Sequence, residues 1–450
     1  MTRRKRIAIA SVAAILLALV LVYLIGRIDA SPPDDSDLTL ARPDIPADGN
    51  GYSLLVQACD AIDWDECSDD RQARIAEVGT WNQSRVDAAL AKNAAALELF
   101  DRALACPRAQ FPKCLDQPEA WERHTLILMA LDLHDSRAKD RLRKGQDHEA
   151  LQDALGLIRF GQALQESSRC LVDHLFACRF KADGLRLARA CARGGKIAAA
   201  DLQALNKQIA RCPPQTEDLA AALCGEYQNT AARLDGLKSG RYHWGDLVNP
   251  RPRKDPVPLG DYLMHPNSTK RSFVEAFRFH IATASLAYPE ARRQQQVWWQ
   301  GFEGKKPSKP RMVMLILSPN GYGVCVYYAM MPAVRDFWKG LHEQRVELTA
   351  TRLVLAAKAF KIEKGRLPER LDELVPDYLE TLAPDDLDGK PLRFNSGRMV
   401  VYSIGQDLQD DGGMTREEME AWWTANNADA GTSNYEYDLW RLPDPSFPIE

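Results

Sequence analysis

The sequence predicts a mostly α-helical protein with an N-terminal transmembrane helix, an antiparallel helical array and a C-terminal α+β domain that contains a short antiparallel hairpin. Three observations predict this class: a long apolar run near the N-terminus, apolar residues at i, i+3, i+4 spacing through the next two hundred residues, and short β-like runs among glycines and prolines near the C-terminus. These patterns divide the chain into residues 1–28, 29–51, 52–240, 241–331 and 332–450.

The first segment has the pattern of a membrane anchor. A basic cluster, Arg3-Arg4-Lys5-Arg6, precedes the apolar run Ile7 to Ile25, which at about 1.5 Å per residue spans the roughly 30 Å hydrocarbon core. A cleaved signal peptide is the alternative, but its apolar region would cover only about 7 to 15 residues. Because basic residues stay in the cytoplasm, we expect a single-pass protein of the bacterial inner membrane, with its N-terminus cytoplasmic and its bulk periplasmic.

Composition indicates an oxidising compartment and argues against a nucleic-acid ligand. The formal net charge is -4, and no basic stripe follows the first six residues, so a nucleic-acid ligand is not expected. Ten cysteines, an even number, indicate disulfides in an oxidising compartment. Cys106 and Cys114 flank a loop with two prolines, where a bridge would contribute roughly 2 to 3 kcal/mol. Cys170 and Cys178 lie eight residues apart on a predicted helix, about 12 Å, which is too far for a bridge.

The middle of the chain predicts linkers and helices. Residues 29–51 are rich in Asp, Pro, Gly and Ser and predict a disordered tether. Residues 52–240 carry helical periodicity, whereas residues 241–331 are proline-rich and basic around one or two helices. These connections are either surface loops or a basic patch with exposed tryptophans at the membrane surface. A Pro-Asn-Gly break inside Met312 to Met331 favours a buried core segment over a second membrane span.

The C-terminal part changes from one long helix to short elements. The helix is expected from Pro332 to about Glu363 and to end at Gly365. A short helix over Leu367 to Tyr378 follows. Two short strands, around Leu392 to Asn395 and Met399 to Ser403, are then joined by a Ser-Gly turn.

This order resembles the globular domain of the type II secretion major pseudopilin, over about residues 346–443. The residues that carry the resemblance are Ala356, Ala359, Phe360, Gly365, Pro368, Leu371, Leu374, Tyr378, Leu379, Pro384, Asp385, Gly389, Lys390, Pro391, Tyr402, Ser403, Gly405, Asp407, Asp411, Gly412 and Gly413. A pseudopilin has a short leader and an acidic residue in its apolar helix, whereas Ile7 to Ile25 contains no acid. We therefore expect a pseudopilin-like domain used in another setting, with an atypical pseudopilin as an alternative.

The resemblance implies a calcium site in the loop after the Tyr-Ser strand. Asp407, Asp410 and Asp411 supply three carboxylates within five residues of a glycine-containing loop, and calcium takes six to eight oxygen ligands. Asp438 stands near the point where such folds return a strand to the loop, so it is a further candidate ligand. A solvated acidic turn without an ion is the other interpretation.

No motif of a metalloprotease, a hydrolase nucleophile elbow or a phosphate-binding loop occurs in the sequence. The sequence therefore favours a binding or scaffold role, linked to secretion or envelope assembly through envelope proteins that it does not identify. The alternative is an extracytoplasmic hydrolase that uses carboxylates of the helical domain. A pocket with two convergent acids, or with a His-acid pair, would favour that alternative.

Overall fold

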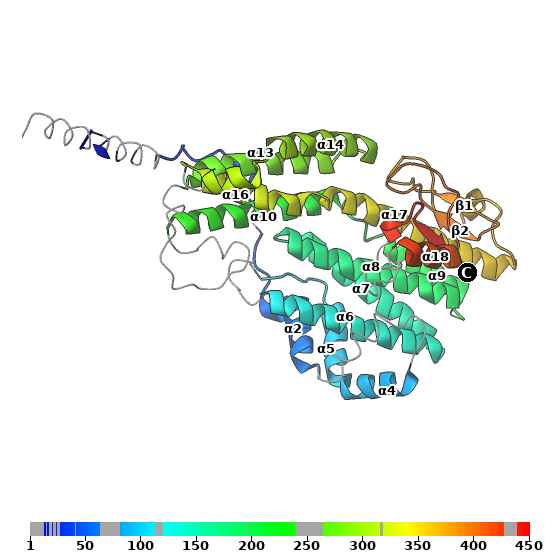
Figure 1. Cartoon of the computed structure of the whole chain (residues 1–450). Helices are drawn as coiled ribbons and strands as arrows, with labels where there is room; N and C mark the ends of the chain where they lie inside the picture. Colours follow the sequence, from blue (N-terminus) through cyan, green and yellow to red (C-terminus); the bar gives the residue numbers. More distant parts are fainter. Residues whose placement is uncertain are drawn as a thin grey trace, which may run out of the picture. The chain divides into compact units, whose positions relative to one another are not determined.

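The computed structural model describes residues 28–40, 42–63, 82–112, 120–194, 196–239, 264–315, 318–426 and 439–450, together with positions 13, 14, 16, 17, 20 and 24 (Figure 1). The chain forms two compact units. The first unit comprises Met1–Leu40, Leu223–Thr283 and Gln294–Phe337, and the second comprises Ala41–Ala222, Ala284–Arg293 and Trp338–Glu450. The described part is mostly helical and contains one small antiparallel sheet, in agreement with the predicted class.

The elements follow one another along the chain as helices, with strands only near the C-terminus. The α-helices are α2 (Gly51–Ala61), α4 (Gln83–Lys92), α5 (Ala94–Leu104), α6 (Ala120–Arg143), α7 (Asp147–Ser167), α8 (Leu171–Gly194), α9 (Ala199–Ile209), α10 (Thr216–Lys238), α13 (Pro266–Ala284), α14 (Tyr288–Lys305), α15 (Lys309–Leu315), α16 (Gly321–Met330), α17 (Phe337–Lys364) and α18 (Arg416–Asn426). The 3₁₀ turns are η1 (Ser36–Leu38), η2 (Ala47–Gly49), η4 (Met331–Val334), η5 (Leu371–Leu374) and η7 (Leu439–Arg441). The strands are β1 (Arg393–Asn395), β2 (Val400–Tyr402) and β3 (Ser446–Pro448).

Helices α7 and α8 share the most extensive contact between two described helices of the second unit. A Cβ on Gly161 would lie 2.8 Å from the carbonyl oxygen of Ala177, and a Cβ on Gly184 would lie 2.7 Å from that of Ala154. Only glycine therefore permits the two backbones to approach so closely. The apolar residues of α7 that give this part of the chain its helical periodicity, such as Leu151, are buried in the core of this unit.

The sheet confirms the predicted hairpin and adds a strand. β1 and β2 pair antiparallel, with Phe394 opposite Val401, and β3 pairs with the other edge of β2, with Phe447 opposite Val401. This third strand comes from the C-terminus and was not predicted. The short helix expected over Leu367 to Tyr378 is reduced to the single turn η5, whereas the long helix α17 ends at Lys364, one residue before Gly365 in a left-handed conformation, as expected.

Residues 29–51 differ from the disordered tether that we expected. In the first unit the Asp29 carboxylate accepts hydrogen bonds from the backbone N–H groups of Asn267 (2.9 Å) and Ser268 (3.2 Å) at the start of α13. The Arg278 guanidinium donates to Asp37 at 2.5 and 2.8 Å. Acidic residues that suggest a solvated linker by composition therefore bind the helix that begins at Pro266.

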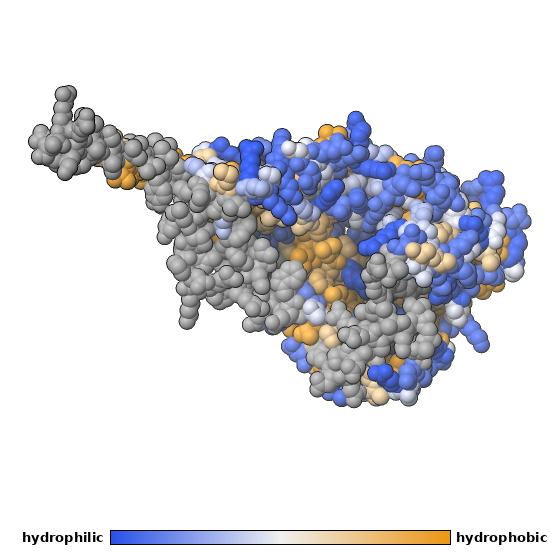
Figure 2. All heavy atoms as spheres, in the orientation of Figure 1, coloured by the Kyte–Doolittle hydropathy of each residue, from blue (hydrophilic) through white to orange (hydrophobic). Residues whose placement is uncertain are grey.

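Most of the predicted anchor Ile7 to Ile25 lies outside the described residues, and within the described part no helix is long and apolar enough to cross a membrane. The hydrophobic residues described there, Leu16, Leu17, Val20 and Leu24, are exposed, and Figure 2 shows hydrophobic atoms on this N-terminal segment. No disulfide joins two of the cysteines that the structure describes. Cys114, the proposed partner of Cys106, lies outside the described residues, so the anchor and that disulfide stay predictions.

Candidate metal centre

The loop between β2 and α18, residues 403–415, is shaped by residues in left-handed conformations. Gly405, Leu408, Gly412 and Gly413 have φ angles of 69°, 66°, 89° and 69°. At Gly405 a Cβ would lie 2.0 Å from the carbonyl oxygen of Pro443, so only glycine can occupy this position. The glycines therefore place the acidic loop directly against the segment that leads into β3.

Asp444, in that segment, is the central residue of the site. Its side chain is 0% exposed, and its Oδ2 accepts hydrogen bonds from the backbone N–H groups of Asp411 and Gly413, both at 2.9 Å. Its Oδ1 is buried and has no hydrogen-bond partner among the described residues. A buried polar atom without a partner costs roughly 1 to 3 kcal/mol, and more when it is charged. The second oxygen of Asp444 therefore requires a proton or a cation.

Electrostatics around Asp444 favour the same conclusion. Burial raises the pKa of its carboxyl group, and the nearby charges of Asp411 and Asp410 raise it further, against the two backbone hydrogen bonds that lower it. A cation placed between these carboxylates would reverse the repulsion among them. A cation beside Asp444 would therefore favour the charged form of its carboxyl group.

Asp410 is already held by other groups. Its Oδ1 accepts hydrogen bonds from the Tyr402 hydroxyl and from the Gly412 N–H, both at 3.1 Å, and its Oδ2 lies 3.6 Å from Nε of Arg393. Burial, together with the Asp410 charge, raises the pKa of Tyr402 to about 12. Asp410 therefore fixes the loop and is less available to a metal than Asp444.

Arg393 provides positive charge on one side of the site. Its guanidinium lies 2.5 Å from Asp388 and 3.4 Å from the fully buried Asp385, as well as near Asp410. One arginine thus pairs with two carboxylates of the loop 385–389 and with one carboxylate of the acidic loop. An additional cation beside Asp411 and Asp444 would offset the repulsion between these two carboxylates.

The predicted ligands are therefore only partly brought together. Asp407 is exposed, and its Oδ1 accepts a hydrogen bond from the Gln409 N–H at 3.1 Å, within its own turn. Asp438 lies outside the described residues. The sequence does not single out Asp444, which lies between two prolines and two residues before β3, because no local motif marks it as a ligand.

The donor set suits calcium, but side chains alone do not complete it. Among the described residues, three side-chain ligand atoms come within 4.8 Å of one another at Asp101, His134 and Asp153, and not in the acidic loop. A calcium ion held by Asp411 and Asp444 would therefore need backbone carbonyl oxygens of the loop as further ligands. Such carbonyls are ordinary calcium ligands, and every donor here is an oxygen.

The Asp101, His134 and Asp153 group is occupied by arginines. The Arg137 guanidinium donates to both oxygens of Asp101, at 2.5 and 2.8 Å, and to Asp153 at 2.9 Å, while Arg141 donates to both oxygens of Asp153 at 2.5 Å. His134 is 0% exposed, with Nε2 at 3.6 Å from Asp153. Two guanidinium groups supply the positive charge that a metal would bring, so this cluster does not fit a metal ion.

This second cluster borders an open groove of about 670 Å³, lined by residues of α5, α6 and α7 and of the turn after α5. Asp101, Arg141 and Asp153 belong to its wall, together with His148, Glu149 and Arg159. The groove therefore carries acidic, basic and imidazole side chains on one wall. Comparisons of the chain with models of protein families, with curated proteins and with solved structures gave no match.

Proposed function

We propose that this protein is a membrane-anchored, extracytoplasmic binding or scaffold protein whose C-terminal domain is pseudopilin-like and stabilised by calcium. The observation that carries the proposal is Oδ1 of Asp444, a buried carboxylate oxygen that lies beside an acidic glycine loop and has no hydrogen-bond partner among the residues the structure describes. Calcium modules outside the cytoplasm bind their ion with dissociation constants of about 10⁻⁴ to 10⁻³ M, which suits a site with few carboxylates.

The order of elements supports the pseudopilin-like part of the proposal. A long helix (α17), a short turn (η5), a hairpin (β1 and β2) and a glycine-rich acidic loop follow one another in the order expected from the resemblance. The return of β3 to β2 places Asp444 on that loop. A domain of this kind presents a rigid surface to partner proteins, and calcium would order its loop.

The apolar run Ile7 to Ile25 supports the anchor, together with the exposure of its described leucines and of Val20. A chain anchored in this way holds its helical array and its C-terminal domain at the envelope, where secretion or assembly partners are located. The inner membrane and the periplasm are therefore the proposed location.

Crosslinking in cells tests the scaffold role. The intact protein, carrying a photoreactive residue at the exposed position Asp407, is crosslinked in cells grown with calcium and in cells treated with a chelator. We expect discrete crosslinked envelope proteins in calcium that weaken after chelation and in Asp444→Asn. Asp410→Asn, which removes a charge from the same loop, serves as the matched control and should retain them. Crosslinks that change neither after chelation of calcium nor in Asp444→Asn would contradict the proposal.

One observation favours an alternative function, an extracytoplasmic hydrolase. Asp101 and Asp153 are two convergent acids on the wall of a groove, and His134 lies beside them. However, burial, which would raise the pKa of Asp153, is outweighed by His134, Arg137 and Arg141, which lower it. Because acid-base catalysis needs one acid kept protonated near neutral pH, the lowered pKa of Asp153 does not suit it to that role.

Hydrolysis assays distinguish the two functions. The full-length protein is incubated with ester, peptide and glycoside substrates, in parallel with Asp101→Asn. Turnover by the wild type that is lost in the variant would establish the hydrolase. Equal background in both proteins would support the binding role.

A further inference from the structure

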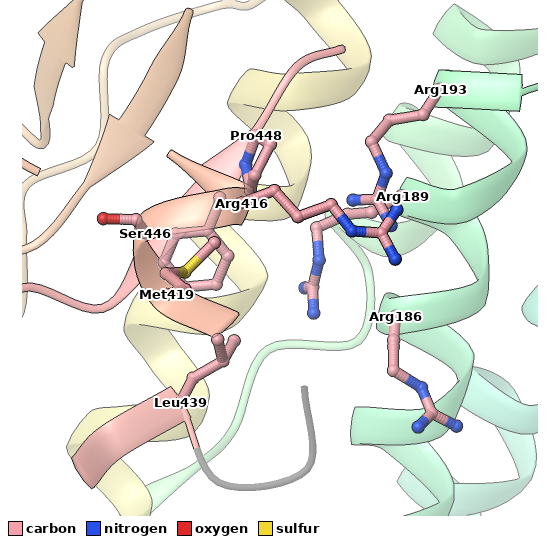
Figure 3. A pocket seen from close by; sticks show the side chains of 9 residues that line it. Arg186, Arg189, Arg193, Arg416, Met419, Leu439, Ser446 and Pro448 are labelled. Carbon is pink, nitrogen blue, oxygen red and sulfur yellow. The ribbon is translucent and has the colours of Figure 1, made fainter. Parts of the chain in front are cut away.

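Four arginines converge on a small pocket in the second unit, which we name the arginine pocket (Figure 3). Its lining consists of Arg186, Arg189, Arg193, Arg416, Met419, Leu439, Ser446, Phe447 and Pro448. The arginines come from α8 and from the first turn of α18, whereas the apolar residues come from α18, η7 and β3. Neither the calcium proposal nor the hydrolase alternative uses this pocket.

Helix geometry aligns three of the arginines. Arg186, Arg189 and Arg193 are spaced i, i+3 and i+7 on α8, so they lie along one face of the helix. Figure 3 shows that Arg416 extends from α18 toward this face and that its guanidinium lies near those of Arg189 and Arg193. The fold therefore brings like charges together from segments more than two hundred residues apart in sequence.

The two buried arginines are held by acids that lie outside the pocket. Arg186 lies 3.2 Å from Asp135 and 3.3 Å from Asp183, while Arg189 lies 2.9 Å from Glu347. The Arg189 guanidinium is also fixed over the Phe447 ring, 5.2 Å from its centre. These three acids pair with the buried guanidinium groups, and none of the three lines the pocket.

The described residues that line the pocket include no acid. Arg416 pairs with Glu420, 3.1 Å away on α18, and Glu420 is likewise not part of the lining. The enclosed space is about 20 Å³, which holds about one water molecule. Any ligand would therefore have to lie in the mouth, against the half-buried Arg193 and the exposed Arg416, with at most about one atom in the interior.

We propose that the arginine pocket binds a phosphate group of a small molecule. The planar, forked guanidinium matches two phosphate oxygens at once, and a phosphate that lies among several guanidinium groups interacts favourably with each of them. A phosphate monoester carries about -1.5 to -2 charges at pH 7, so it satisfies several arginines where a single carboxylate satisfies fewer. The apolar residues on the other wall exclude water from one side of the anion.

Phosphate binding is tested on the full-length protein in a non-ionic detergent. Inorganic phosphate is titrated by calorimetry at constant ionic strength, and acetate and chloride are titrated in the same way. We expect saturable binding of phosphate that is at least about tenfold tighter than that of acetate. The double variant Arg193→Gln, Arg416→Gln should weaken phosphate binding at least about tenfold, because it removes the two accessible guanidinium groups.

A matched control removes one positive charge elsewhere. Arg370 is largely exposed and lies outside the pocket, so Arg370→Gln should bind phosphate as the wild type does. Absence of saturable binding, equal binding of acetate, or unchanged binding by the double variant would overturn the proposal. Circular dichroism of the variants confirms that both remain folded, since neither change touches the buried Arg186 or Arg189.

A further titration identifies the source of the phosphate. A soluble short-chain phosphatidate is used in place of inorganic phosphate, with the same variants. Tighter binding of phosphatidate that depends on Arg193 and Arg416 assigns the pocket to a lipid headgroup. Tighter binding of inorganic phosphate assigns it to small soluble phosphates, and independence from both arginines contradicts either assignment.

Discussion

Two groups of carboxylates in the second unit differ in what balances their charge. At Asp101 and Asp153, Arg137 and Arg141 make direct contact with every carboxylate oxygen. At Asp444, one oxygen accepts two backbone hydrogen bonds and the other has no hydrogen-bond partner in the described part of the chain. The first group is more compact, yet the second is better suited to a metal ion.

The comparison shows that proximity of carboxylates is a weak indicator of a metal site. Acids close together are stable when guanidinium groups lie between them, and such groups exclude a further cation. A buried carboxylate oxygen without a partner is the more informative feature, because the fold gains free energy when an ion or a proton binds there.

The largest expected effect is in the arginine-paired group. Asp153→Ala leaves the buried Arg137 and its neighbour Arg141 without their shared partner, so the free energy of unfolding should fall by about 3 to 5 kcal/mol. Urea denaturation of the full-length protein measures this change. Asp87→Ala removes the exposed ion pair with Lys144 and should change the stability little. A small effect of Asp153→Ala would show that the arginines do not depend on it.

The loop that holds Asp444 depends on Gly405. Gly405→Ala places a Cβ against the carbonyl of Pro443 at a φ of 69°, and should lower the free energy of unfolding by about 2 to 4 kcal/mol. Gly397→Ala is the matched control, because the nearest atom to its Cβ would be 3.5 Å away. Equal stabilities of the two variants would show that the loop relaxes without cost.

In calcium-free protein, the contributions of Asp444 and Asp153 to stability should change with pH in opposite directions. The pKa of Asp444 is raised in the folded state, so the folded protein keeps the proton of this residue to higher pH than the unfolded chain does. The contribution of Asp444 to stability therefore falls as pH rises from the ordinary aspartate range to the raised value. The pKa of Asp153 is lowered, so its contribution is present above the ordinary range and is lost as pH falls through the lowered value.

Urea denaturation between pH 3 and 7, with wild type, Asp444→Asn and Asp153→Asn, measures these opposite slopes. Asp444→Asn should remove the part of the stability that decreases with pH, and Asp153→Asn the part that increases. If both variants removed a pH dependence of the same sign from the free energy of unfolding, the opposite pKa shifts of Asp444 and Asp153 would be contradicted.

The smallest effect is expected at Asp410. Its carboxylate is half-exposed and interacts with Tyr402 and Arg393, so Asp410→Asn should change stability by less than about 1 kcal/mol and calcium affinity less than Asp444→Asn does. Calorimetry with calcium on both variants measures the difference. If Asp410→Asn lost more calcium binding than Asp444→Asn, the ion would have to lie near Asp410 and Arg393 instead.

The sequence predicts the local elements of this fold better than its long-range contacts. Apolar spacing and terminal glycines indicate α7 and α17, and the Ser-Gly turn indicates the hairpin. Asp444 could not be selected in the same way, because its position on the loop depends on β3 pairing with β2 from more than forty residues away. The acidic linker was misinterpreted because its partners, the start of α13 and Arg278, lie over two hundred residues further along the chain.

The arginine pocket shows the same limit. The i, i+3, i+7 spacing of three arginines is visible in the sequence of α8, but it is also typical of a solvated helix face. Only the packing of α18 and β3 against that face adds Arg416 and the apolar wall.

Calcium titration of the full-length protein, freed of metal with a chelator and followed by calorimetry, tests the central claim most directly. We predict saturable binding of one calcium ion with a dissociation constant of about 10⁻⁴ to 10⁻³ M. Asp444→Asn should weaken it at least about tenfold, or about 1.4 kcal/mol, while Asp153→Asn leaves it unchanged. Absence of binding by the wild type, or equal binding by Asp444→Asn, would contradict a calcium site at Asp444.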